Sequence, residues 1–241
     1  MTTRICLWSG PRNISTALMY SFAQRDDTTV VDEPLYAHYL SVTPADVYHP
    51  GAADVLASME SDGAMVVENA IFGTYPTPVV FFKQMTHHLV DLDTSFLDRT
   101  VNVLLTRDPH DMLRSYAAVV ATPSVADTGY PQAAVLLDDL RRRGQDPVVI
   151  DSTVALENPE SILVQLCDRI GIPFDPAMLS WDAGPRPEDG VWAPHWYSSV
   201  HRSTGFGPPR RHRDPFPAAL QSLLDECVPL YEAVAASALL P

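Results

Sequence analysis

The chain has little of several features that would place it in other protein classes. Its three cysteines, Cys6, Cys167 and Cys227, lie far apart and form no C-x-x-C pair, so neither a disulfide framework nor a zinc knuckle is indicated. No apolar run approaches the roughly 20 residues of a membrane span, and the first residues lack the apolar core of a signal peptide. We therefore expect a soluble, cytoplasmic protein.

Positive charge is also scarce, with 16 Lys and Arg against 30 Asp and Glu and a formal net charge of −14. Nucleic acids and anionic membranes bind cationic faces, so we expect neither as a partner. Any anion must be held by a local cluster of donors. A length of 241 residues with 46% hydrophobic content suits a single domain spanning 1–241. The oligomeric state stays open.

Short β-branched segments alternate with helical patterns along the chain. The expected strands are 4–8, 28–33, 79–83, 101–106 and 147–151, and the expected helices are 15–24, 110–120, 132–143, 159–170 and 216–236. This alternation predicts an α/β fold, a three-layer sandwich with a central parallel sheet of about five strands. Pro and Gly gather in 183–217, which is irregular in pattern and which we expect to close over a ligand.

The first predicted strand runs into a helix through the segment LWSGPRNISTALMYSF, residues 7–22. Backbone N–H groups at a helix start bind anions, so residues 12–16 can cradle a phosphate. Ser15 and Thr16 add hydroxyl donors and Arg12 adds a full charge. The alternative is that Ser15 only caps the helix. The triphosphate-binding pattern G-x-x-x-x-G-K-[ST] is not present.

A second segment, TRDPHDMLRSY at 106–116, combines an arginine and a serine. Arg107 ends a predicted strand, and Ser115 falls on the second turn of the next helix. Ligands of open α/β sheets bind outside the carboxyl ends of the strands, which is where Arg107 is expected. On its own, such a pair is most often a surface pair.

Together, these two segments resemble the sulfotransferase family that uses 3′-phosphoadenylyl sulfate (PAPS). In that family a loop of the type Pro-Lys-Ser-Gly-Thr-Thr binds the 5′-phosphosulfate, and an Arg-x7-Ser motif holds the 3′-phosphate. The resemblance implies a P-loop-like sulfotransferase fold, with PAPS as donor, adenosine 3′,5′-bisphosphate as product, and no metal. The cofactor-binding residues that it implies here are Pro11, Arg12, Asn13, Ile14, Ser15, Thr16, Arg107 and Ser115.

The resemblance covers most of the chain. It is strongest to a bacterial and plant sulfotransferase-like group sharing WSGPRNISTALMYSFAQR, VDEPLY and GPxPEDGVWAPxWYxSVHxSTGF. Plant members have carried an aminotransferase name, but no lysine here has a recognisable pyridoxal-binding context. By position, VHRSTGF at 200–206 is similar to the family's C-terminal cofactor clamp. That similarity implies further cofactor contacts from Arg202, Ser203, Thr204 and Gly205.

The resemblance also implies catalytic residues. Glu33 follows the second strand in VVDEPLYAHYL, where glycan sulfotransferases have a general base, and we expect that strand to lie beside the first. Lys83 in FFKQMTHHL matches the lysine that cytosolic sulfotransferases place on the bridging oxygen, and Arg12 adds charge. His87 and His88 follow Lys83 by four and five residues rather than two. They are the second choice of base, with packing or capping as the alternative.

These features favour a sulfotransferase acting on a hydroxyl or amine of a small molecule. The predicted 183–217 cover carries the aromatic residues Trp192, Trp196, Tyr197 and Phe206, which suit a partly apolar acceptor. One alternative is a P-loop kinase or phosphohydrolase, in which TTVVDE is a Walker-B strand that holds magnesium. Another is a nucleotide-binding protein without catalytic activity.

Overall fold

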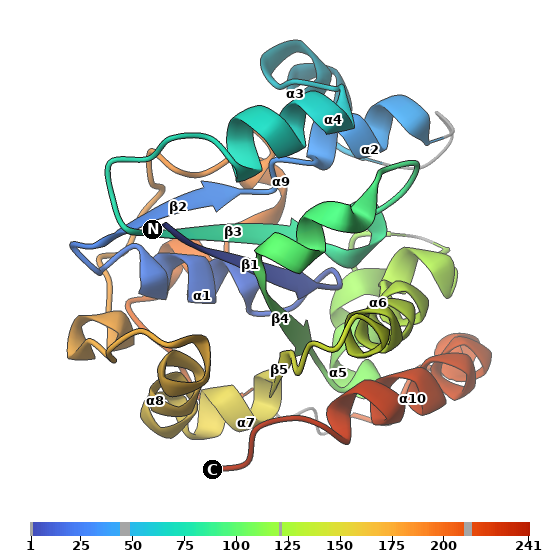
Figure 1. Cartoon of the computed structure of the whole chain (residues 1–241). Coiled ribbons are helices and arrows are strands. Elements are labelled where there is room, and N and C mark those ends of the chain that lie inside the picture. Colours follow the sequence, from blue (N-terminus) through green and yellow to red (C-terminus); the bar gives the residue numbers. More distant parts are fainter. Residues whose placement is uncertain (1, 44–48, 121, 210–213) are drawn as a thin grey trace.

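The computed structural model describes residues 2–43, 49–120, 122–209 and 214–241. These residues form a sheet of five parallel strands in the order β2-β3-β1-β4-β5, drawn at the centre of Figure 1. The predicted α/β sandwich around a parallel sheet is confirmed. The strands are β1 (Thr3–Ser9), β2 (Thr28–Asp32), β3 (Val79–Met85), β4 (Val101–Thr106) and β5 (Val148–Asp151).

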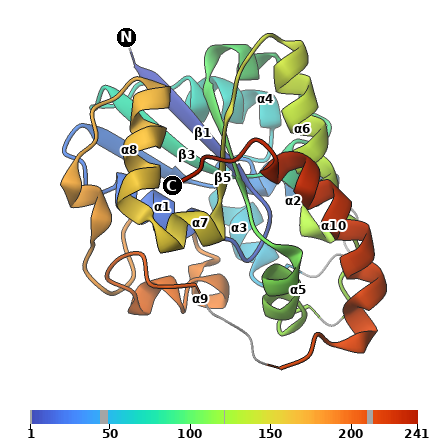
Figure 2. The same cartoon turned by 90° about the horizontal axis from the view of Figure 1, so that it is seen from below.

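Helices cover both faces of the sheet (Figures 1 and 2). On one face, α1 and α8 pack through Leu18, Phe22 and Leu166 against the strands, and on the other α6 and α10 pack through Leu136 and Val234. The α-helices are α1 (Ser15–Phe22), α2 (Tyr36–Val42), α3 (Ala52–Ser58), α4 (Gly63–Val66), α5 (Pro109–Ala117), α6 (Tyr130–Arg142), α7 (Ser152–Glu157), α8 (Pro159–Ile170), α9 (Ala193–Trp196) and α10 (Gln221–Ala235).

Burial on both faces explains why the strands read as continuous apolar runs. Every residue of β3 and β5 is buried, as is β1 from Ile5 onward. Successive residues of a strand point to opposite faces of the sheet and so pack in two different hydrophobic cores. Phe81 packs against the α1 side, whereas Phe82 packs on the opposite side with Trp8.

The strand order corrects one expectation. We expected the strand that precedes Glu33 to lie beside the first strand, but β3 lies between β2 and β1. Lys83 of β3 is in register with Leu7 of β1 on one side and with Asp32 of β2 on the other. Strand order depends on contacts between segments distant in sequence, which local patterns do not encode. The result is that Glu33 lies next to Lys83.

Several element boundaries also differ from expectation, and the contacts explain two of them. Strand β3 continues through Gln84 and Met85 instead of ending at Lys83, because both residues pair with the end of β1 and are buried there. The last helix begins at Gln221 rather than at 216, after Pro217 and a 3-10 turn at Ala218–Leu220. Asp108 caps α5, since its side chain accepts from the His110 N–H, and Pro109 is the first helical residue.

The Pro- and Gly-rich segment is irregular, as the sequence indicated. Between 183 and 209 it contains the single turn α9 and a 3-10 turn at Val200–Arg202. Residues 210–213 of the predicted cover lie outside the described residues. No helix in the described ranges is long and apolar enough to cross a membrane.

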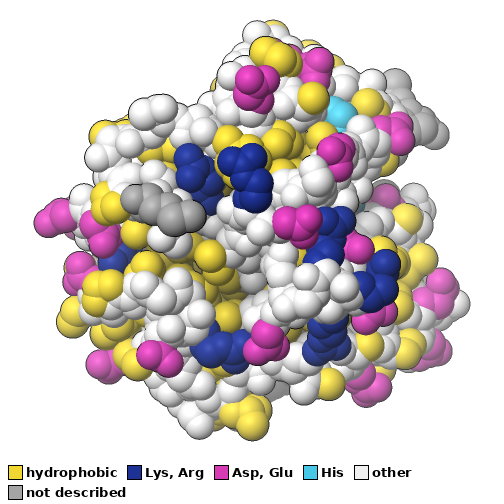
Figure 3. Space-filling view, viewed as in Figure 1, with side chains coloured by type: hydrophobic (Ala, Val, Ile, Leu, Met, Phe, Trp, Pro, Cys, Tyr) yellow, Lys and Arg dark blue, Asp and Glu magenta, His cyan; other side chains and the backbone are white. Residues whose placement is uncertain are grey.

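The surface carries mixed charge. On the face drawn in Figure 3, arginine side chains lie in small groups, most with an acidic side chain nearby. Arg143 pairs with Asp98 and Asp139 at 3.1 and 2.7 Å. In such pairs the negative charge of the carboxylates offsets the positive charge of the arginine.

Candidate functional site

The loop between β1 and α1 lies at the carboxyl end of the central strand, where ligands of open parallel sheets bind. Arg12 has a left-handed backbone, with φ of 56°. A Cβ on Gly10 would lie 2.6 Å from the carbonyl oxygen of Thr128, so only glycine fits there. The loop is therefore held in a tight turn against the segment that precedes α6.

Helix α1 begins without a side-chain cap. Its N-cap is Ile14, and Ser15 is the first helical residue, so the interpretation of Ser15 as a capping residue is wrong. Leu18 makes the first intrahelical bond, to the Ile14 carbonyl at 3.0 Å. The N–H groups of residues 15–17 therefore have no partner within the helix, which is the arrangement found at anion sites.

The Arg107 and Ser115 pair meets this loop. Arg107 donates from Nη1 to the Arg12 carbonyl oxygen at 2.6 Å, and Arg12 donates from Nε to Ser115 Oγ at 2.9 Å. Tyr130 in turn donates its hydroxyl to the Arg107 carbonyl at 2.7 Å. Two guanidinium groups and one hydroxyl from three elements thus converge at the carboxyl ends of β1 and β4.

Asn13 ties the loop to the neighbouring strands. Its amide donates to the Leu105 carbonyl at 3.1 Å, and its side-chain oxygen accepts from the Ile14 N–H at 3.0 Å and from the Ser152 hydroxyl. Ser152 opens α7 after β5. Asn13 therefore orients the loop rather than pointing toward solvent.

A second polar cluster lies where β2 and β3 end. The ammonium of Lys83 donates to Asp32 Oδ1 at 3.0 Å, to Tyr197 Oη at 2.7 Å and to a Glu33 carboxylate oxygen. Only 2% of the Lys83 side chain is exposed. The sequence had singled out Lys83 and Glu33, but it gave Asp32 a role only as a possible magnesium ligand and Tyr197 only as an aromatic.

Burial and charge set the protonation of this cluster. Burial raises the pKa of Glu33, an effect that Lys83 only partly offsets. Burial opposes the charged form of Lys83, but Asp32 and Glu33 outweigh it and raise the pKa of the amine. Glu33 also has an unusual backbone, with φ of 41°. A carboxyl group with a raised pKa beside a fixed cation is typical of a general acid or base.

His87 and His88 lie in a 3-10 turn after β3, packed among aromatic rings. His88 lies between Tyr36 and Tyr39, with ring centroids 5.0 and 4.8 Å away and near-parallel planes. Burial lowers the pKa of His87 to about 4 and also lowers that of His88. The buried Nδ1 atoms of both rings have no hydrogen-bond partner within the described residues. Both imidazoles are therefore neutral near pH 7.

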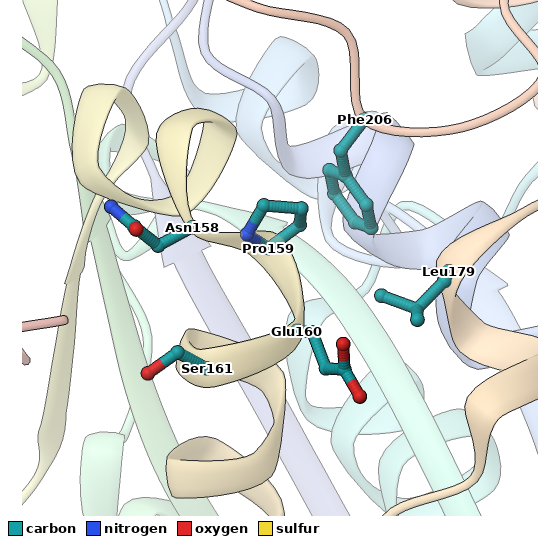
Figure 4. A pocket seen from close by; sticks show the side chains of 6 residues that line it. All are labelled: Asn158, Pro159, Glu160, Ser161, Leu179 and Phe206. Atoms are coloured by element: carbon teal, nitrogen blue, oxygen red, sulfur yellow. The ribbon is translucent and has the colours of Figure 1, made fainter.

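The predicted C-terminal clamp lies on the α1 and α8 side of the sheet. Its contacts there include a bond from Trp181 Nε1 to Ser203 Oγ at 3.2 Å and a bridge between Gly205 and Ser180. Arg202 is exposed. Phe206 packs on Trp181 and, with Leu179, faces the start of α8 across an open pocket (Figure 4). The pocket is lined by Asn158, Pro159, Glu160, Ser161, Leu179 and Phe206.

The four aromatics of the predicted cover do not all lie together. Trp192 and Tyr197 are buried beside the Lys83 cluster, with Trp196 packed against the same group. The rings of Trp192 and Tyr36 meet edge-on, with their centroids 5.0 Å apart. Phe206 instead belongs to the pocket at α8.

Among the described residues, no three His, Cys, Asp or Glu side chains converge as a possible metal site.

Comparisons with known proteins agree with this fold. A family model described as a sulfotransferase domain matches residues 3–238. Branched-chain-amino-acid aminotransferase-like proteins 1 and 2 of Arabidopsis thaliana are 43% and 40% identical over 225 residues, 93% of this chain. The chain spans only about 40% of the length of these curated relatives.

Solved structures of similar fold include two with near-complete coverage. A sulfotransferase domain from the curacin biosynthetic pathway has a TM-score of 0.57 and 16% identity, covering 100% of this chain and 99% of its own. A sulfotransferase from Alicyclobacillus acidocaldarius has a TM-score of 0.56 and 13% identity, covering 99% and 98%. At these identities the likeness concerns the fold.

Proposed function

The chain belongs to the sulfotransferase domain family, and we propose that it transfers the sulfuryl group of PAPS to a hydroxyl or amine of a small molecule. The observation that carries this proposal is the meeting of Arg12, Arg107 and Ser115 at the uncapped start of α1. This cluster offers charge and N–H donors for two phosphate-type groups on a chain of net charge −14.

We assign the 5′-phosphosulfate to the loop 11–16. The N–H groups of residues 15–17 point out of the helix start, and the Ser15 and Thr16 side chains lie in the same first turn. Arg12 supplies a full positive charge, and its planar guanidinium binds oxyanions through two donors at once. Asn13 holds the loop in place through Leu105 and Ser152.

We assign the 3′-phosphate to Arg107 and Ser115, which already share Arg12 as a neighbour. The nucleoside end has a candidate place in the Phe206 pocket. Helix α7 separates that pocket from the loop, because Ser152 contacts Asn13 and Asn158 lines the pocket. Six helical residues span about 9 Å. A separation of this length suits a nucleotide that spans from the loop to the pocket. Residues 202–205, next to Phe206 in the chain, would then lie close enough to contact the nucleoside.

The donor, when bound, supplies an activated sulfuryl group whose leaving oxygen gains negative charge. Positive groups aimed at that oxygen lower the barrier, and one such donor is worth about 2.7–4 kcal/mol. Arg12 and Lys83 are our candidates for this role, Lys83 through its charge alone, because its three N–H groups already donate to Asp32, Glu33 and Tyr197. Glu33 is our first choice to take the acceptor proton, because burial raises the pKa of its carboxyl group and so makes it a stronger base. Neutral His87 and His88 are the second choice.

Our inference about the acceptor starts from the surroundings of His87 and His88. Tyr36, Tyr39 and His49 surround the two rings, and the buried Nε2 of His49 also has no partner among the described residues. An unsatisfied buried donor or acceptor costs about 1–3 kcal/mol, which a polar ligand group or water removes. We therefore propose a small acceptor with an aromatic or apolar body and a polar group that can bind these ring nitrogens.

Two measurements test the proposal. Calorimetry should give tighter binding of adenosine 3′,5′-bisphosphate than of ATP with Mg²⁺, because the site offers donors for a separate 3′-phosphate. Incubation with ³⁵S-labelled PAPS and cell extract should then yield a labelled small molecule. Binding of ATP only with Mg²⁺ would favour a kinase or phosphohydrolase instead. Tight bisphosphate binding without a labelled product would favour the inactive binding protein.

A further inference from the structure

Lys83 is the sole lysine of the chain. Every N–H donor of its ammonium group is used in a hydrogen bond within the protein. The group has three N–H bonds, and it makes three hydrogen bonds, to Asp32, Glu33 and Tyr197. A buried ammonium is costly unless every proton is matched. The position of Lys83 therefore depends on all three partners, of which Tyr197 comes from a segment more than 100 residues away in sequence.

The hydroxyl of Tyr197 is saturated as well. It donates its one proton to Asp32 Oδ2 at 2.7 Å, and it accepts from Lys83 at 2.7 Å and from Trp192 Nε1 at 3.0 Å. A hydroxyl has one donor and two acceptor positions, so none is left over. Phenylalanine at this position would leave Lys83, Trp192 and Asp32 each short of one bond.

The same segment is attached at a second point. The buried Asp189 carboxylate accepts from the Tyr20 hydroxyl of α1 at 2.7 Å and contacts His201 Nε2 at 2.9 Å. The next residue, Gly190, donates its N–H to Asp32 Oδ2 at 3.1 Å. A Cβ on Gly190 would lie 2.2 Å from the Trp192 ring, so only glycine fits between these contacts.

From these contacts we infer that Tyr197 is a positioning residue: its hydroxyl fixes the Lys83 ammonium beside Glu33 and fastens residues 189–201 over the ends of β2 and β3. The inference rests on the proposed function for its effect on turnover. Its effect on Lys83 itself does not depend on that function. Tyr197 acts through Lys83 and Asp32 and needs no contact with substrate.

The test uses the fact that the chain has a single lysine. Tyr197→Phe should raise the rate at which N-hydroxysuccinimidyl acetate acetylates Lys83 by at least about tenfold, measured by mass spectrometry of the Lys83 peptide. It should lower kcat by at least about tenfold and change the Kd of adenosine 3′,5′-bisphosphate by less than about twofold, since Arg107 and the loop 11–16 are untouched. The matched control is Tyr75→Phe, which removes a hydroxyl bound to the Ala70 carbonyl and should change none of these values.

Unchanged acetylation in Tyr197→Phe would overturn the inference, even if kcat fell, because the hydroxyl would then act on substrate directly. If the wild-type chain binds bisphosphate but transfers no sulfuryl group, the proposed function fails and the acetylation comparison still decides the inference. Should Tyr197→Phe not fold, Trp192→Phe removes only one of the three bonds of the hydroxyl. That variant should raise acetylation by a smaller factor, and an unchanged rate would again contradict the inference.

Discussion

Replacing Glu33 by glutamine should lower activity while raising stability at neutral pH. The cluster buries one cation, Lys83, with two carboxyl groups, Asp32 and Glu33. Glutamine keeps an oxygen that accepts from Lys83 but removes one buried negative charge. If Glu33 takes the acceptor proton, kcat should fall at least about 10²-fold, equivalent to about 2.7 kcal/mol of barrier, with the Kd of the bisphosphate unchanged.

The stability effect has a defined pH dependence. Because burial raises the pKa of Glu33 above its ordinary 4.5, the folded protein keeps this proton to a higher pH than the unfolded chain does. The free energy of unfolding of the wild type should therefore fall as pH rises above 4.5, by up to about 1.4 kcal/mol per pH unit from this one group, until Glu33 ionises in the folded state. The Gln variant lacks this slope.

Urea unfolding of both proteins from pH 5 to 8, followed by tryptophan fluorescence, measures the difference. As the pH rises, the free energy of unfolding of Glu33→Gln should exceed that of the wild type by a growing amount. The exposed control Glu68→Gln should follow the wild type. Parallel curves for Glu33→Gln and wild type would refute the raised pKa. Near-normal kcat in Glu33→Gln would refute its assignment as the base.

Four further predictions concern the rest of the site. Arg107→Ala should weaken adenosine 3′,5′-bisphosphate binding by at least about tenfold more than adenosine 5′-monophosphate binding by calorimetry, since a charge-assisted bond contributes about 1.5–3 kcal/mol; equal losses would place Arg107 elsewhere. His87→Ala and His88→Ala should each lower kcat less than Glu33→Gln, and an inactive histidine variant would reverse the assignment. EDTA should leave turnover unchanged because Arg12 supplies positive charge, whereas activity restored by Mg²⁺ would favour the kinase alternative. Gly10→Ala should lower the thermal midpoint by crowding the Thr128 carbonyl, at a cost of about 1–3 kcal/mol, and an unchanged melt would show that the turn relaxes.

Local patterns were enough to predict the elements of the sheet. Helix α8 spans the predicted 159–170 and β4 the predicted 101–106, because apolar periodicity and flanking prolines report directly on backbone conformation. The turn from β1 into α1, which we propose as the anion site, was predictable for the same reason. Arg12 follows the buried strand β1, Ser15 and Thr16 open the helix after it, and Arg107 directly follows the neighbouring strand β4.

Only the tertiary structure decided which side chains, distant in sequence, form ion pairs and hydrogen bonds with one another. That β3 lies between β1 and β2, and so brings Lys83 against Asp32 and Glu33, depends on long-range pairing that no local pattern specifies. The same holds for Tyr197, whose hydroxyl meets Lys83 across 114 residues of sequence. The sequence alone determined the kinds of group available, and folding determined their partners, because a buried charge takes its protonation state and orientation from the neighbours that replace water.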